Sequence, residues 1–168
     1  MSVASDFLTQ ARHLLTYDRR RPKQASLRRA VSAAYYALFH LLTEEAARRL
    51  VGEASKPLRQ QVQRAFDHGT MRQCCRSFSG GALPGNLAPL IAAQPSPSLR
   101  VVARHFLLLQ DARHVADYDM SRDYTRANAE ALIEQAEQAF AAWRTIRVTN
   151  EAKTFLVSLL LWKAWNRT

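Results

Sequence analysis

The chain of 168 residues carries a formal net charge of +10 and two cysteines, Cys74 and Cys75. Adjacent cysteines do not form an ordinary disulfide with each other, and a chain of this length buries enough apolar surface to fold without one. The composition therefore excludes a disulfide-stabilised secreted domain. We expect one domain over residues 1–168 in a reducing cytoplasm.

The chain is not expected to enter a membrane. Its first residues, MSVASDFLTQARHLL, lack the basic leader and apolar core of a secretory signal. The longest apolar run, Phe155 to Trp162, is interrupted by Ser158 and is far shorter than the roughly 20 residues that a membrane span needs.

Long stretches without glycine or proline, rich in Ala, Leu, Arg, Glu and Gln, predict helices. The first helix is expected over residues 5–17, and the second, longer one over 26–50 with Gly52 as its stop. A third should cover 56–68 and end at Gly69, and a short extra one 71–78.

Residues 79–97 hold three of the five glycines and four of the six prolines, which predicts the main internal loop. Ser98 is expected to cap a fourth helix through residue 119, and Thr125 to cap a fifth. The segment RVTNEAK should break this last helix before a C-terminal helical extension, residues 150–168, that is buried or faces a partner. The predicted fold is all-α, an antiparallel bundle of four to five helices.

The second predicted helix carries the segment AYYALFH, residues 34–40. Tyr36 and His40 are one turn apart, and Arg29 lies about two turns before Tyr36 on nearly the same face. Tyr35 falls on the other stripe, with Val31. One tyrosine is therefore expected in the core and the other at a groove or a second subunit, and a structural role for the segment is favoured over a functional one.

The fourth predicted helix carries QDARHVADYD, residues 110–119. Arg113 and Asp117 are spaced to pair on the helix, and so are His114 and Tyr118. Asp117 and Asp119 lie near the C-terminal end, where the helix dipole favours cations. We expect either solvated charges there or a polar network with arginines from elsewhere in the chain.

Basic residues are concentrated in the first half, where residues 1–80 carry 14 basic and 6 acidic side chains against 10 and 8 in the rest. Arginine forks suit phosphate groups, so a polyanion such as RNA is one expected partner and a solvated arginine-rich surface is the alternative. The candidate anion-binding residues are Arg19, Arg20, Arg21, Lys23, Arg28 and Arg29.

Motifs for metal or nucleotide-phosphate chemistry are missing from the sequence. It has no HExxH, no spaced cysteine pairs and no glycine-rich phosphate loop, which argues against zinc hydrolases and P-loop enzymes. No metal ligands and no cofactor are predicted. Arg72 and Arg76 flank the two cysteines and favour a lowered thiol pKa, but a structural thiol pair is the better interpretation.

Four segments, in order, resemble the HEPN domain (higher eukaryotes and prokaryotes nucleotide-binding), in particular its small stand-alone bacterial members. They are SLRRAVSAAYYALFHLL, FDHGTMRQCCRSFSGG, ARHVADYD and TRANAEALIEQAEQAFAAW, and the resemblance covers about residues 5–145. It implies a helical bundle that forms a homodimer. It also implies metal-independent RNase activity of the kind found in toxin–antitoxin, CRISPR-associated or phage-defence systems.

The catalytic pattern of that family is an Arg followed, four to six residues later, by a His. At the matching place this chain has Arg113 and then Tyr118 where the His is expected. Arg113 would serve the phosphate, His114 or His68 the proton transfer, and Tyr118 would donate a hydrogen bond. The resemblance therefore implies a protein that binds RNA or a nucleotide-like anion, with a degenerate or weak RNase centre.

The alternative function is a non-catalytic interaction module that docks a partner protein, such as a nucleotidyltransferase antitoxin of the kind many HEPN proteins are paired with. In either case Tyr36 and His40 are expected to share a polar network with His68, Asp117 and Asp119.

Overall fold

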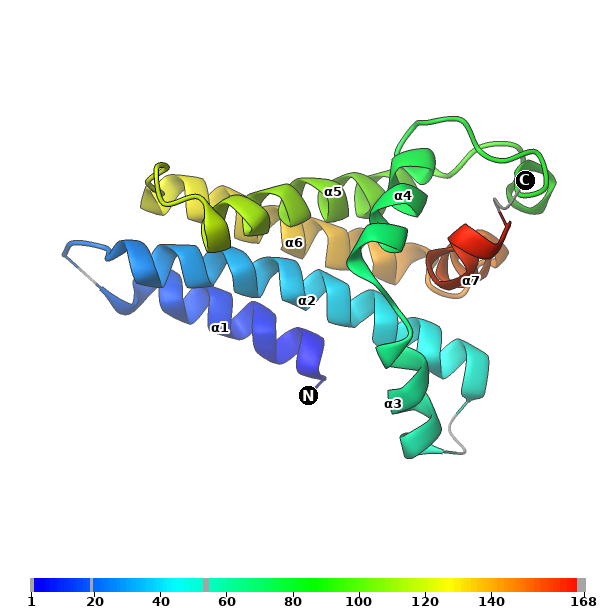
Figure 1. Ribbon diagram of the computed structural model, residues 1–168, viewed down its shortest axis with the longest axis horizontal. Helices are drawn as coiled ribbons and strands as arrows, with labels where there is room; N and C mark the ends of the chain where they lie inside the picture. Colours follow the sequence, from blue (N-terminus) through cyan, green and yellow to red (C-terminus); the bar gives the residue numbers. More distant parts are fainter. Residues whose placement is uncertain (1, 19, 53–54, 166–168) are drawn as a thin grey trace. The chain divides into compact units, whose positions relative to one another are not determined.

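The structure, a computed structural model, describes residues 2–18, 20–52 and 55–165. Within these residues the chain forms seven α-helices, one short 3-10 helix and no strand (Figure 1). The predicted all-α class is confirmed. In chain order the elements are α1 (Val3–Tyr17), α2 (Gln24–Val51), α3 (Lys56–Arg64), α4 (His68–Phe78), η1 (Ala88–Ile91), α5 (Pro97–Tyr118), α6 (Arg126–Ile146) and α7 (Asn150–Trp165).

Two predicted helix ends are confirmed by their hydrogen bonds. Thr125 caps α6, because its Oγ1 accepts from the backbone N–H of Asn128 at 3.1 Å. Gly52 ends α2 at a φ of 67°, with its N–H donating to the carbonyl of Arg48 at 2.8 Å. The break predicted in RVTNEAK also occurs, between Ile146 and Asn150.

Two other boundaries were predicted wrongly. The cap of α5 is Ser96, whose Oγ accepts from the N–H of Leu99 at 3.2 Å, and not Ser98, because Pro97 already occupies the first helical position. The helix predicted over 56–68 ends at Arg64. Asp67 then caps a new helix, its Oδ1 accepting from the N–H of Thr70 at 2.9 Å, so His68 begins α4 and Gly69 lies in its first turn.

Contacts within the chain define two compact units. Unit 1 comprises Met1–Leu41 and His105–Phe140, and unit 2 comprises Leu42–Arg104 and Ala141–Thr168. Helices α2, α5 and α6 each contribute residues to both units. The prediction of a single domain stays a prediction.

Unit 1 consists of α1 and the neighbouring parts of α2, α5 and α6, which run alongside one another in Figure 1. Short connections at residues 18–23 and 119–125 make α1 and α2, and likewise α5 and α6, antiparallel. Tyr35 is fully buried, and its ring lies 5.6 Å from that of Phe106, centroid to centroid, which joins α2 to α5. Ala11 and Leu15 form the buried stripe of α1.

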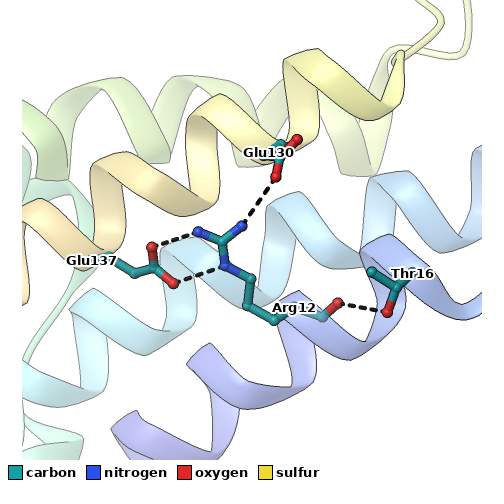
Figure 2. Close-up of polar contacts among 4 residues, drawn as sticks. All are labelled: Arg12, Thr16, Glu130 and Glu137. Atoms are coloured by element: carbon teal, nitrogen blue, oxygen red, sulfur yellow. Dashed lines mark hydrogen bonds and ion pairs between the residues drawn. The ribbon is translucent and has the colours of Figure 1, made fainter.

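Helix α1 is also joined to α6 by Arg12 (Figure 2). The guanidinium of Arg12 donates from Nε to Glu137 Oε1 at 2.8 Å and from Nη2 to Glu137 Oε2 at 2.5 Å, while Nη1 lies 3.5 Å from Glu130 Oε1. The hydrogen bond with Glu137 raises the pKa of Arg12, and the same bond lowers the pKa of Glu137. This bidentate pair links α1 to α6 within unit 1.

Unit 2 has an aromatic centre made by α4 and α7, which pack against each other. The ring of Phe78 meets that of Phe155 edge-on at 5.0 Å and that of Trp162 at 6.4 Å, centroid to centroid. The predicted C-terminal extension is thus helical over its described part and buries Phe155, Leu159 and four other residues. The main loop, residues 79–97, contains η1, which packs against α7.

Among the described residues, no helix has the length and apolar character required to span a membrane.

Candidate functional site

The side chains singled out on α2 line a hollow in unit 1, which we call the α1/α2 hollow. Its volume is about 540 Å³, and its lining comes from α1 and one stripe of α2: Phe7, Gln10, Leu14, Arg29, Ser32, Ala33, Tyr36 and His40. The residues from α2 follow the three- and four-residue spacing of one helix face, as do those from α1. Tyr36 is half-buried in this hollow while Tyr35 is in the core, so the predicted division of the two tyrosines is confirmed.

Three rings form one wall of the hollow. Phe7 and His40 are stacked, with ring planes 3° apart and centroids separated by 5.2 Å. Tyr36 is tilted against both rings, with its centroid 5.8 Å from that of Phe7 and 6.4 Å from that of His40. The rings hold α1 against α2 and give the hollow an aromatic surface.

A second hollow, of about 340 Å³, lies between α2 and the C-terminal end of α5. It is lined by Ala25, Arg28, Arg29, Ala116, Asp117, Tyr118 and Met120. Arg29 lines both hollows, and its side chain is exposed. Arg29 is therefore a predicted anion-binding residue that the structure places at a concave surface and leaves open to solvent.

A polar network links α2 to α5 beside these hollows. Ser32 Oγ donates to Asp117 Oδ1 at 2.5 Å, and Arg113 Nη1 lies 3.5 Å from Asp117 Oδ2. The guanidinium of Arg113 also lies over the ring of Tyr35, 5.3 Å from its centroid. Burial lowers the pKa of Arg113, but Tyr36, Tyr35 and Asp117 together raise it above its ordinary value. Arg113 is thus held within unit 1 by a carboxylate and a ring.

Arg28 has a structural role that differs from the predicted anion binding. Its side chain is buried, and its guanidinium donates to the carbonyls of Ala116 and Asp119 at 3.0 Å each, to that of Val115 at 3.4 Å, and to that of Arg122. Val115 and Ala116 lie in the last turn of α5, and Asp119 and Arg122 follow it, so this one guanidinium joins the end of the helix to the loop after it. Arg28 supplies the positive charge that the acidic end of α5 was expected to need.

The other predicted basic residues lie in the connection between α1 and α2. Arg20, Arg21 and Lys23 are exposed there, and Arg19 lies outside the described residues. The connection is fixed by Asp18, whose Oδ2 accepts from Ser26 Oγ at 2.7 Å and from the N–H of Lys23 at 3.1 Å. These two hydrogen bonds lower the pKa of Asp18. Asp18 therefore joins the end of α1 to Lys23 and to Ser26 in the first turn of α2.

The three predicted catalytic residues are not gathered at one point. His114 and Tyr118 are exposed, and their rings pair along α5 with centroids 5.1 Å apart. Arg113 points to a different side of the helix, where its side chain is 14% exposed and pairs with Asp117. Both predicted pairs on α5 are thus present, but within one chain the phosphate-binding arginine and the histidine have different surroundings.

The two aspartates that were predicted to share one polar network have different partners. Asp117 bonds to Ser32 and Arg113, whereas Asp119 turns to its own loop, its Oδ1 accepting from the N–H and Oγ of Ser121 at 2.9 and 2.6 Å. The two bonds from Ser121 lower the pKa of Asp119. His68 belongs to unit 2, where it begins α4.

Cys74 and Cys75 are both free thiols in the interior of unit 2. Burial raises the pKa of each thiol well above its ordinary value, so neither forms a reactive thiolate at neutral pH. No group of three or more His, Cys, Asp or Glu side chains is placed to hold a metal ion within the part of the chain that the structure describes.

Sequence reasoning singled out Arg29, Tyr36 and His40 and missed the other five residues of the α1/α2 hollow. These are Phe7, Gln10, Leu14, Ser32 and Ala33. The only available signal was the i, i+3, i+7 spacing of Phe7, Gln10 and Leu14, which describes a stripe adjacent to the buried one.

The chain matches no family model, no curated protein and no solved structure.

Proposed function

We propose that this chain is a HEPN-like, homodimeric protein that binds RNA or a nucleotide-like anion, with a degenerate RNase centre, within a toxin–antitoxin or defence system. The observation that carries the proposal is the α1/α2 hollow, where an exposed guanidinium, Arg29, stands beside three rings. Cations for phosphate and rings for bases are the two elements from which single-stranded nucleic acid sites are built.

The electrostatics of unit 1 support an anionic partner. Arg20, Arg21 and Lys23 are exposed on the turn that precedes α2, and Arg29 follows on the first turns of that helix. Each phosphate that such a surface neutralises releases counterions, so binding should weaken with salt. Fluorescence anisotropy with a labelled single-stranded RNA tests this. Affinity that falls steeply from about 50 to 200 mM salt is expected, and affinity unchanged by salt contradicts the proposal.

The degenerate centre is inferred from the surroundings of Arg113. Cleavage of RNA without a metal needs a proton acceptor, a proton donor and a cation at one phosphate. Arg113 is engaged by Asp117 and Tyr35, and the neighbouring ring pair is His114 with Tyr118 on the solvent side. A phenol is a poor base at neutral pH, so Tyr118 does not replace a histidine.

Incubation of the purified protein with RNA tests the degenerate centre, and no cleavage above background is expected. Arg113→Ala is the first comparison, and His114→Ala is the second because that side chain is exposed and its loss leaves the interior intact. Cleavage that is abolished by either substitution, in a variant with an unchanged circular dichroism spectrum, would show that the centre is active.

The proposed dimer interface would cover two exposed apolar side chains of unit 1. Tyr118 and Met120 are 67% and 77% exposed beside the hollow between α2 and α5. Light scattering on the purified protein should give twice the mass of one chain, and Met120→Glu should lower it. A monomer at all concentrations would contradict the dimer without affecting the RNA-binding proposal.

A further inference from the structure

The α1/α2 hollow has the features of a site for one nucleobase. None of its eight lining residues is acidic, while Phe7, Tyr36 and His40 provide ring surface and Arg29 provides a positive charge. We propose that this hollow binds one unpaired base of a single-stranded RNA, with the adjoining phosphate at Arg29. This inference rests on the proposed RNA binding and assigns that binding a place and a substrate class.

The size and aromatic character of the hollow point to a flat, uncharged ring system. A volume of about 540 Å³ lies within the range of small-molecule sites and is sufficient for one base with its sugar. The stacked rings of Phe7 and His40, with Tyr36 tilted against them, give a base the π surfaces on which nucleotides stack. Stacking accepts any base, so the site selects single strands and not a sequence.

Polar groups of the hollow match the edge of a base and its phosphate. Gln10 is exposed at the lining, and its amide offers both a donor and an acceptor. Ser32 lines the hollow and donates its proton to Asp117, so its oxygen keeps only acceptor capacity. Arg29 also lines the hollow and is exposed, so its guanidinium can meet the phosphate that adjoins the base.

An apolar segment of a protein partner is a poorer occupant of the same hollow. It would bury the Gln10 amide and the Arg29 guanidinium without partners, and an unpartnered buried polar group costs more than its hydrogen bond contributes. A nucleotide supplies acceptors for both groups. We therefore assign the hollow to RNA, and protein binding is an outcome of the experiment that follows.

The test compares a single-stranded RNA of about twelve nucleotides with an abasic strand of the same length, in which every sugar and phosphate remains but the bases are missing. Anisotropy is measured for the full chain and for Phe7→Leu, His40→Gln and Arg29→Gln. Arg144→Gln is the matched control, because it removes an exposed arginine that lies outside the hollow and outside the predicted anion-binding residues.

The unaltered protein should bind the abasic strand about tenfold more weakly than the RNA. Phe7→Leu and His40→Gln should weaken RNA binding by a similar factor but leave abasic binding unchanged, because the interaction that they remove needs a base. Arg29→Gln should weaken both ligands. The abasic comparison needs no variant, so it decides the question even where Phe7→Leu fails to fold.

Equal affinity for the two strands, with no effect of the ring substitutions, would overturn the base site while the RNA-binding proposal stands on Arg20, Arg21 and Lys23. Ring substitutions that weaken both ligands equally would also overturn it. No binding of either strand would remove the proposed function itself, together with this inference. Loss of dimer mass, and not of RNA affinity, on Phe7→Leu would assign the hollow to a second copy of the chain.

Discussion

In unit 1, Arg28, Ser32 and Asp117 carry polar contacts into the interior, whereas the interior of unit 2 is centred on the rings of Phe78 and Phe155. Unit 2 also buries the Glu45 side chain, but its partner Arg147 is 48% exposed. Helices of similar composition are thus held together by two different means within one short chain.

The difference indicates that buried polar contacts, as well as apolar packing, determine the helix positions in unit 1. Apolar contacts such as those between α4 and α7 are favourable because they exclude water, and they have no preferred direction. Buried polar groups must each meet a partner, so they constrain the positions of α2 and α5 closely. The α1/α2 hollow lies in the unit with these constraints, which is where a preorganised binding site is expected.

The largest effect should follow from removing the aromatic centre of unit 2. Phe155→Ala is expected to lower the free energy of unfolding by about 3 to 5 kcal/mol, because it leaves a cavity against Phe78. Leu161→Ala, at a position 37% exposed, should cost less than about 1 kcal/mol. Urea unfolding followed by circular dichroism measures both. Equal losses would mean that unit 2 does not depend on this centre.

The corresponding change in unit 1 is Arg28→Met, which removes hydrogen bonds to the end of α5 but keeps an apolar side chain. We expect a loss of about 2 to 3 kcal/mol, because buried carbonyls such as that of Ala116 lose a charged donor. Arg29→Met is the matched control at the next position and should change stability by less than about 0.5 kcal/mol. A similar cost for both substitutions would remove the contrast between the units.

A smaller, pH-dependent effect is expected at the start of α4. The hydrogen bond from Thr70 Oγ1 is the main cause that lowers the pKa of Asp67 from 3.8 to about 2. A carboxylate whose pKa is lowered on folding stabilises the protein fully above its unfolded pKa, and this contribution is lost as the pH falls from about 4 towards 2. Asp67→Asn should reduce that acid sensitivity and cost about 1 kcal/mol at neutral pH. Unfolding midpoints measured from pH 6 to pH 2 that run parallel for both proteins would contradict this role.

The smallest effect should come from the ion pair that joins α1 to α6. The side chains of Arg12 and Glu137 are 36% and 40% exposed, so water screens their attraction. A double-mutant cycle with Arg12→Ala and Glu137→Ala should give a coupling energy of about 0.5 kcal/mol that decreases in high salt. A coupling above about 2 kcal/mol would place this pair among the interactions that hold unit 1 together.

Features that depend on neighbouring residues in the sequence could be predicted. The cap at Thr125, the stop at Gly52 and the pairing of Arg113 with Asp117 each involve residues at most four positions apart. The division of Tyr35 and Tyr36 between the core and a groove followed from helical periodicity alone.

Features that depend on distant residues could not be predicted. Arg28 was predicted to belong to a basic surface cluster. Its acceptors are backbone carbonyls about 90 positions away, and no sequence pattern indicates such a contact. The α1/α2 hollow was predicted only in part for the same reason. The sequence pattern indicated the stripe on α2, but the ring that stacks on His40 comes from α1. At 64–68 two adjacent helix signals competed, and the Asp67 cap prevailed over the stop signal of Gly69.

The contact between Arg28 and the end of α5 also has a consequence for the order of folding. The arginine is synthesised 88 residues before Ala116 and 91 before Asp119. Its hydrogen bonds can therefore form only after most of the chain has been synthesised. Closing so long a loop is slow compared with forming a helical turn. The last turn of α5 should therefore be among the latest segments to gain protection from hydrogen exchange during refolding, although helix α5 itself forms early.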